Sequence, residues 1–141
     1  MHWGRIFIGG LVAGVVINVS EAILNVPVLG KDWAEAMAAL GKPGEFNGGQ
    51  IALFNVMGFL SGIALVWLYA AIRPRYGAGP RTAVCAGAAI WFLSYALPSI
   101  GQIALDLWPL RAMVIALVWG LVEMIVAGLV GGWLYREPSA V

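Results

Sequence analysis

The sequence holds very few residues that carry charge or bind metals. Its 141 residues include one cysteine, one histidine, 8 lysines and arginines together, and 7 aspartates and glutamates together. A single cysteine excludes an intrachain disulfide and a cysteine-based metal site. The lone histidine, His2, leaves no pair of histidines for haem ligation inside a bundle. A net charge of +1 gives no positive field, so we expect no nucleic-acid partner.

Motifs of the common enzyme classes are missing as well. The sequence has no HExxH motif, no P-loop, no GxSxG elbow and no CxxC pair. Its serines have no histidine to activate them, and Asp32 and Asp106 lie outside the apolar runs. We therefore assign no catalytic residue, no metal ligand and no cofactor. The sequence favours a non-enzymatic protein.

What the chain has in abundance is apolar surface. Hydrophobic residues make up 62% of the sequence and charged residues 11%, where a soluble domain carries about 25% charged residues. A soluble protein rarely exposes apolar patches beyond a few hundred Å², so the solvent that fits this chain is a lipid bilayer. The 19 glycines and 7 tryptophans agree, because glycine is frequent in membrane helices and tryptophan collects at membrane interfaces.

Four apolar runs are long enough to cross about 30 Å of hydrocarbon at 1.5 Å per residue. Helices are favoured over strands because lipid cannot satisfy free backbone groups. The first run exceeds the ~7–15 residues of a signal-peptide core, so we expect a retained helix. The sequence predicts a single integral membrane domain over residues 1–141, an all-α bundle of four antiparallel transmembrane helices. The expected helices cover about residues 6–29, 50–72, 82–105 and 112–135.

Positive charges divide unevenly between the two ends of these helices. Cytoplasmic loops carry the excess of lysine and arginine, which places both termini in the cytoplasm. Low lysine and high alanine, glycine and arginine usage suggests a bacterium with a GC-rich genome, and hence its inner membrane. One side collects Arg5, Arg73, Arg75, Arg81 and Arg136, and the other collects Lys31, Lys42 and Arg111.

The first outer loop contains a short amphipathic pattern at about residues 32–40. Trp33, Ala36, Met37 and Leu40 follow the i, i+3, i+4, i+7 spacing of one helical face. One interpretation is an interfacial helix that lies on the lipid headgroups. The alternative is a lid over the outer mouth of the bundle.

Each expected membrane helix has one face of small or polar residues. Lipid tails are as apolar as leucine, so helices associate through close backbone approach and polar contacts. We predict that Gly10, Gly14, Gly58, Gly62, Gly128 and Gly132 serve helix packing, within the chain or between copies. On the third helix the predicted inward face is Ala83, Gly87, Ser94, Pro98 and Gly101.

Two glutamates lie deep within the expected spans and on these polar faces. A charge at the bilayer centre costs at least ~2.5–3.5 kcal/mol on insertion scales, and no lysine, arginine or histidine occurs in the expected spans. The glutamates can be protonated because burial disfavours the charged form, they can line a hydrated cavity, or they can bind a cation. The competing interpretation is a protonated carboxyl that only joins helices. The candidate ligand- or ion-binding residues are Asn18, Glu21, Asn25, Asn55 and Glu123.

Three functions remain open on these observations. The first is a non-enzymatic oligomeric or accessory membrane component with a polar cluster around Glu21. The second is a proton- or cation-coupled transporter or channel that uses Glu21 and Glu123. The third is a pigment- or lipid-binding subunit, in which an oxygen ligand could hold a chlorin magnesium. The expected partners are membrane lipid and other membrane chains or copies of this one.

Overall fold

The computed structural model describes residues 1–136, which form helices and loops with no strand among them. Four helical segments are long and apolar enough to cross a membrane: Trp3–Val28, Gly48–Tyr76, Pro80–Ala104 and Leu110–Leu134. This confirms the predicted all-α membrane bundle. Each segment begins slightly before the residue expected from hydropathy, because the helical backbone continues into the flanking polar residues.

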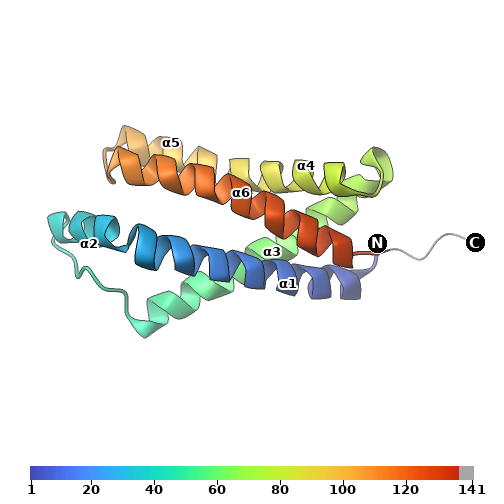
Figure 1. Cartoon of the computed structure of the whole chain (residues 1–141), viewed down its shortest axis with the longest axis horizontal. Coiled ribbons are helices and arrows are strands. Elements are labelled where there is room, and N and C mark those ends of the chain that lie inside the picture. Colours follow the sequence, from blue (N-terminus) through green and yellow to red (C-terminus); the bar gives the residue numbers. More distant parts are fainter. Residues whose placement is uncertain (137–141) are drawn as a thin grey trace, which may run out of the picture.

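The elements are α1 (Trp3–Ile23), a π turn η1 (Leu24–Val28), α2 (Gly30–Ala39), α3 (Gly48–Tyr76), α4 (Pro80–Trp91), a π turn η2 (Phe92–Ala96), α5 (Leu97–Ala104) and α6 (Leu110–Leu134). Helix α1 packs against α3 and α6, and α4 packs against α6 and α3. Figure 1 shows the N-terminus and the end of α6 at one end of the bundle and α2 at the other. The short helix α2 matches the amphipathic segment expected in the first outer loop.

The first half of α3 diverges from the rest of the bundle (Figure 1). Residues 48–57 are all exposed, whereas Gly58 and Gly62 further along the helix are buried. The helix begins with a capping box, in which Asn47 Oδ1 accepts from the Gln50 amide at 3.0 Å and Gln50 Oε1 accepts from the Asn47 amide at 2.9 Å. The start of α3 is therefore capped by its own side chains, and this half of the helix stands apart from the rest of the bundle.

Close helix contacts occur where glycines meet. A Cβ atom on Gly10 would lie 2.6 Å from the Ile63 Cα, and one on Gly14 would lie 2.6 Å from the Phe59 ring. On Gly62 a Cβ atom would collide with the backbone of Gly10 and Gly14. These three glycines thus let the α1 and α3 backbones approach each other within one chain.

Helix α6 meets its neighbours in the same way. A Cβ atom on Gly128 would lie 2.9 Å from the Ala83 carbonyl oxygen, whereas one on Gly132 would reach the Tyr69 ring at an ordinary 3.4 Å. Gly131, next in the chain, is the tighter position, because its Cβ atom would lie 2.5 Å from a Val66 methyl group. The closest contact at this end of α6 therefore involves Gly131 and not Gly132.

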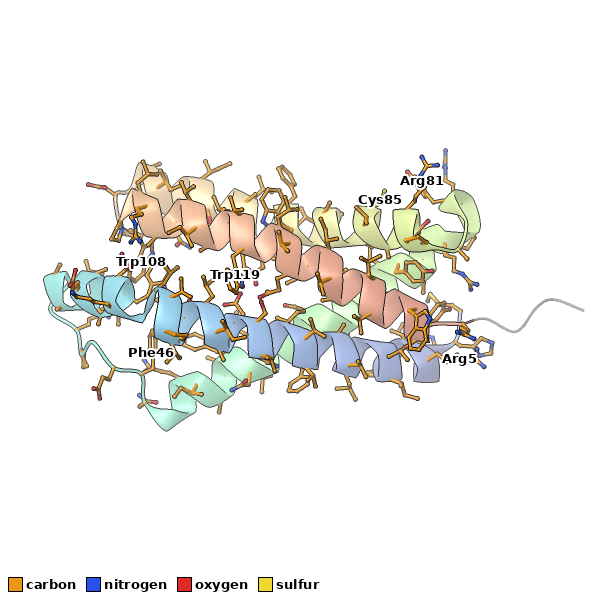
Figure 2. The ribbon with its side chains drawn as sticks, viewed as in Figure 1. Arg5, Phe46, Arg81, Cys85, Trp108 and Trp119 are labelled. Atoms are coloured by element: carbon orange, nitrogen blue, oxygen red, sulfur yellow. The ribbon has the colours of Figure 1, made fainter. Side chains whose placement is uncertain are left out.

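Two tyrosines pack together at the end of the bundle that holds the N-terminus and the end of α6. The rings of Tyr69 and Tyr135 meet edge to face at 6.1 Å, and the His2 amide donates to the Tyr135 hydroxyl at 3.2 Å. Arg5 and Arg81 lie at this same end (Figure 2). Arg5 near the N-terminus and the arginine-rich loop that contains Arg81 thus share one end of the bundle, as the positive-charge pattern predicts. Which side of the membrane that end faces stays a prediction.

The third membrane segment departs from the predicted inward face. Ala83 and Gly87 are buried as predicted, but Ser94, Pro98 and Gly101 are exposed, so the outer half of that prediction is wrong. The inward side chains there are Tyr95 and Ser99.

The cause is the π turn η2, which lies just before Pro98. Proline has no N–H and its ring collides with the preceding turn, so the regular hydrogen-bond ladder cannot continue through it. A π turn rotates less per residue than an α-helix, and it shifts the phase of the residues that follow. The turn η1, which contains Pro27, has the same origin.

Candidate functional site

Two glutamates from opposite ends of the sequence meet at one tyrosine. The Tyr95 hydroxyl lies 2.8 Å from Glu21 Oε1 and 3.0 Å from Glu123 Oε1, and it is hydrogen-bonded to both. Glu123 is buried, at 4% exposure, while Glu21 and Tyr95 are half-buried. Glu21 lies about 10 Å along the helix from Val28 at 1.5 Å per residue. The cluster is therefore inside the membrane-spanning part of the bundle.

The number of protons in this cluster follows from its geometry. A tyrosine hydroxyl has one proton to donate and lone pairs to accept with. If Tyr95 donates to one carboxylate, its contact with the other carboxyl is a hydrogen bond only when that carboxyl is protonated and donates to the phenol oxygen. Both contacts are full hydrogen bonds when the pair of carboxyls holds one proton in addition to the phenol's own.

A chain of hydrogen bonds leads from Glu21 toward the end of the bundle where α2 lies. Asn25 Nδ2 donates to Glu21 Oε2 at 2.6 Å, and Trp33 Nε1 donates to Asn25 Oδ1 at 2.9 Å. Asn25 lies in the π turn η1 and Tyr95 lies in η2. Single π turns occur frequently at functional sites because they redirect side chains. Both residues that hydrogen-bond to Glu21 are placed by such turns.

An apolar groove between α1 and α6 borders the cluster. It has a volume of about 560 Å³ and is lined by Val16, Ser20, Val114, Ile115, Val118, Trp119, Val122, Glu123 and Val126. Trp119 crosses the groove, and its Nε1 donates to the Ser20 hydroxyl at 2.9 Å. Figure 2 shows Trp119 between the two helices. Glu123 and Ser20 are thus the two polar side chains on an otherwise apolar wall.

One oxygen of Glu123 has no hydrogen-bond partner among residues 1–136. Its Oε1 contacts Tyr95, but its Oε2 is buried and unpaired. An unsatisfied buried acceptor costs about 1–3 kcal/mol, and more when the group is charged. The other polar neighbours of this carboxyl are Ser20 and Glu21, and neither forms a hydrogen bond to Oε2 in this structure.

Two of the predicted site residues lie elsewhere. Asn18 Nδ2 donates to the Asn55 carbonyl oxygen at 3.1 Å, and Asn55 Nδ2 donates to the Ile51 carbonyl oxygen within its own helix. Asn18 also packs over Gly58. This pair occupies the crossing of α1 and α3, and neither side chain hydrogen-bonds to a carboxyl in the described structure. The structure brings together Glu21, Asn25 and Glu123 from the predicted set.

The donor set of the cluster bears on which cation it could hold. Ca²⁺ takes six to eight oxygen ligands and Mg²⁺ demands a near-ideal octahedron. Within residues 1–136 no group of three His, Cys, Asp or Glu side chains is close enough to hold a metal ion. The two carboxyls and the phenol fit a proton or a single N–H donor better than a metal ion.

Sequence reasoning missed Tyr95 and Trp119. At the regular helical rotation, Tyr95 falls beside the predicted polar face of its helix and not on it. The position of Tyr95 deep within its membrane segment could have identified it, because a tyrosine hydroxyl far from both interfaces needs a hydrogen-bond partner. Trp119 likewise lies well inside its span, away from the interfaces where tryptophan is usual.

We compared the chain with protein-family models, with curated proteins and with solved structures, and none of the three comparisons gave a match.

Proposed function

We propose that this chain is a small multi-pass transport protein that exchanges protons with a cationic solute across a bacterial inner membrane. The observation that carries the proposal is the buried carboxyl cluster, in which Glu21 and Glu123 share the Tyr95 hydroxyl. Intramembrane carboxyls are expensive to insert, and they commonly mark proton or ion pathways.

The cluster has the features that exchange requires. Two carboxyls meet at one hydroxyl and can share a proton there, and Glu123 Oε2 is an acceptor without a hydrogen-bond partner among the described residues. A cation at Glu123 would neutralise the charge that the shared proton otherwise neutralises, so proton and cation would compete for the same site. The chain of Asn25 and Trp33 connects this site toward α2 at one end of the bundle. In this proposal that end is outer, and both termini are cytoplasmic.

The second candidate function is an oligomeric or accessory membrane component. The observation that favours it is that the cluster of Glu21, Tyr95 and Glu123 also joins α1, the third membrane segment and α6. Its weakness is that Gly10, Gly14, Gly62 and Gly128 already contact neighbouring helices of the same chain. Those glycines therefore already form helix contacts within one chain, and they do not provide a packing surface for a second chain. No described contact favours a pigment-binding subunit.

The test is charge movement on a supported membrane. Proteoliposomes are adsorbed to a sensor, the external pH is changed in a step, and the current is recorded. We expect a current from the natural chain that Glu21→Gln and Glu123→Gln each reduce at least about tenfold. Glu35→Gln is the matched control, because Glu35 lies exposed on α2 and pairs only with Lys31 at 3.9 Å.

The outcome decides between the two candidates. Currents that survive both glutamine variants, or that do not exceed those of empty liposomes, would overturn the transport proposal. If the variants also shift the oligomeric state in detergent, the accessory role takes its place.

A further inference from the structure

The groove between α1 and α6 has a chemistry that selects one class of occupant. Its residues on α6 run from Val114 to Val126, about 18 Å at 1.5 Å per residue. Small-molecule sites have volumes of about 300–1,000 Å³ and apolar walls with a few polar groups, and the 560 Å³ groove fits this range. A long, thin apolar body matches its length better than a compact solute does.

The polar end of the occupant is set by Glu123. Its Oε2 is buried and unpaired, on a side chain that is only 4% exposed and lines the groove. Whichever carboxyl of the pair holds the shared proton on Oε1, this oxygen is an acceptor. Oε2 is out of reach of a water-sized molecule and its carboxyl lies beside Ser20 and Glu21, so a donor in the groove reaches it when the Glu123 side chain turns outward. A positively charged N–H donor then also balances the carboxylate.

The occupant would enter the groove laterally, from the hydrocarbon core of the bilayer. Val114, Val118, Val122 and Val126 of the groove are 49%, 61%, 57% and 43% exposed, so in a membrane they face acyl chains. The outer route is covered instead, because Trp33 of α2 hydrogen-bonds to Asn25 above Glu21. An occupant that partitions into lipid reaches Glu123 without passing α2.

We infer that the groove between α1 and α6 binds a lipophilic primary amine, with its ammonium group on Glu123 Oε2 and its alkyl chain along the valines of α6. This inference rests on the proposed function and names its substrate class. The titratable side chains that face the ammonium position are Glu21 on α1, Tyr95 on η2 and Glu123 on α6. Asp32 and Arg111, at the α2 end of the bundle, pair with each other at 2.9 Å.

The experiment uses radiolabelled dodecylamine with the full chain in lipid nanodiscs, and empty nanodiscs give the background of partitioning. We expect saturable binding that dodecyltrimethylammonium and dodecanol compete for at least about tenfold more weakly than dodecylamine does. The first competitor has the charge without an N–H, and the second has a donor without the charge. Hydrogen bonds to charged groups are strong enough for a difference of this size.

Two variants locate the site. Glu123→Gln removes the charge, and Val118→Trp fills the groove without touching the carboxyl. Both should abolish saturable binding, while Val56→Trp, at a position 52% exposed on α3, should leave it unchanged. Binding that persists in Val118→Trp, or equal competition by all three amphiphiles, would overturn the inference.

The proton currents keep this test separate from the proposed function. We expect Val118→Trp to retain pH-driven current while it loses amine binding. If the natural chain gives pH-driven current but no saturable dodecylamine binding, the substrate assignment is wrong and the transport proposal still stands. Loss of the currents themselves sinks the transport proposal.

Discussion

The indole of Trp33 donates to the side-chain oxygen of Asn25 across 2.9 Å, which ties the short helix α2 to the residue that donates to Glu21. Trp33 also meets the Trp108 ring edge to face at 5.6 Å, and Figure 2 shows Trp108 near the α2 end of the bundle. A helix that only rests on headgroups needs no such bond. This contact favours the lid interpretation of α2 over the interfacial one.

Trp33→Phe tests the lid. The variant keeps an aromatic ring against Trp108 but loses the N–H that reaches Asn25. A net hydrogen bond is worth about 0.5–1.5 kcal/mol, so amide exchange in α2 should accelerate about three- to tenfold. Hydrogen–deuterium exchange read by mass spectrometry measures this. Trp67→Phe, at an exposed position on α3, should leave α2 unchanged, and an equal effect of both variants would contradict a lid held by Trp33.

The ion pair between Arg111 and Asp32 is a second contact that holds α2 against the bundle, here against α6. Arg111 Nη1 donates to Asp32 Oδ1 at 2.9 Å, with side-chain exposures of 71% and 23%. Exposed pairs contribute about 0.2–1 kcal/mol, and salt weakens them. Arg111→Gln should therefore raise α2 amide exchange by up to about fivefold, and high salt should have the same effect on the natural chain. Lys31→Gln serves as the control, since its pair with Glu35 lies within α2. Insensitivity to salt would show that this pair does not hold α2.

Tyr95→Phe isolates the shared hydroxyl. The ring stays packed against Gly120, where a Cβ atom would lie 2.9 Å from it, so the fold should survive. Side-chain hydrogen bonds between membrane helices are worth about 0.6–2 kcal/mol. We expect a loss of about 1 kcal/mol in unfolding free energy, measured by denaturant titration in detergent micelles.

A double-mutant cycle separates this bridge from general packing. If Tyr95 acts through Glu123, the losses from Tyr95→Phe and Glu123→Gln will not add. Tyr76→Phe, at 65% exposure, provides the matched tyrosine control. Strict additivity of the first two substitutions would mean that the hydroxyl bridge carries no energy.

Gly62→Ala tests the crossing of α1 and α3. The added methyl group meets the backbone of Gly10 and Gly14, which cannot move aside as a side chain can. Overpacking of this kind costs typically about 1–3 kcal/mol, to be read as a lower thermal unfolding midpoint in detergent. Gly101→Ala has nothing within 4 Å of its new Cβ, so it should be neutral or stabilising because alanine favours helix. Equal midpoints for the two variants would refute a tight crossing at Gly62.

Much of the architecture could be predicted from residue chemistry alone. Apolar runs of bilayer length demand helices because lipid leaves backbone groups no other partner, and the four spans follow from that. The short helix between the first two spans follows from its amphipathic spacing. The polar phase of the first and fourth helices also placed Glu21, Asn25 and Glu123 on inward faces, which the structure bears out through Tyr95.

Only the tertiary structure decided which of the polar residues meet. Asn18 lies on the same predicted face as Glu21, and Asn55 lies on the predicted polar face of the second helix. The divergence of α3 nevertheless takes Asn55 away from the cluster. Tyr95 enters the cluster because the π turn before Pro98 changes the helical phase, which a fixed rotation per residue cannot anticipate. Hydropathy and periodicity determine which segments cross lipid and which face turns inward. The pairing of Glu21 with Glu123 depends on crossing points and local turns, and these are set by contacts between segments far apart in the chain.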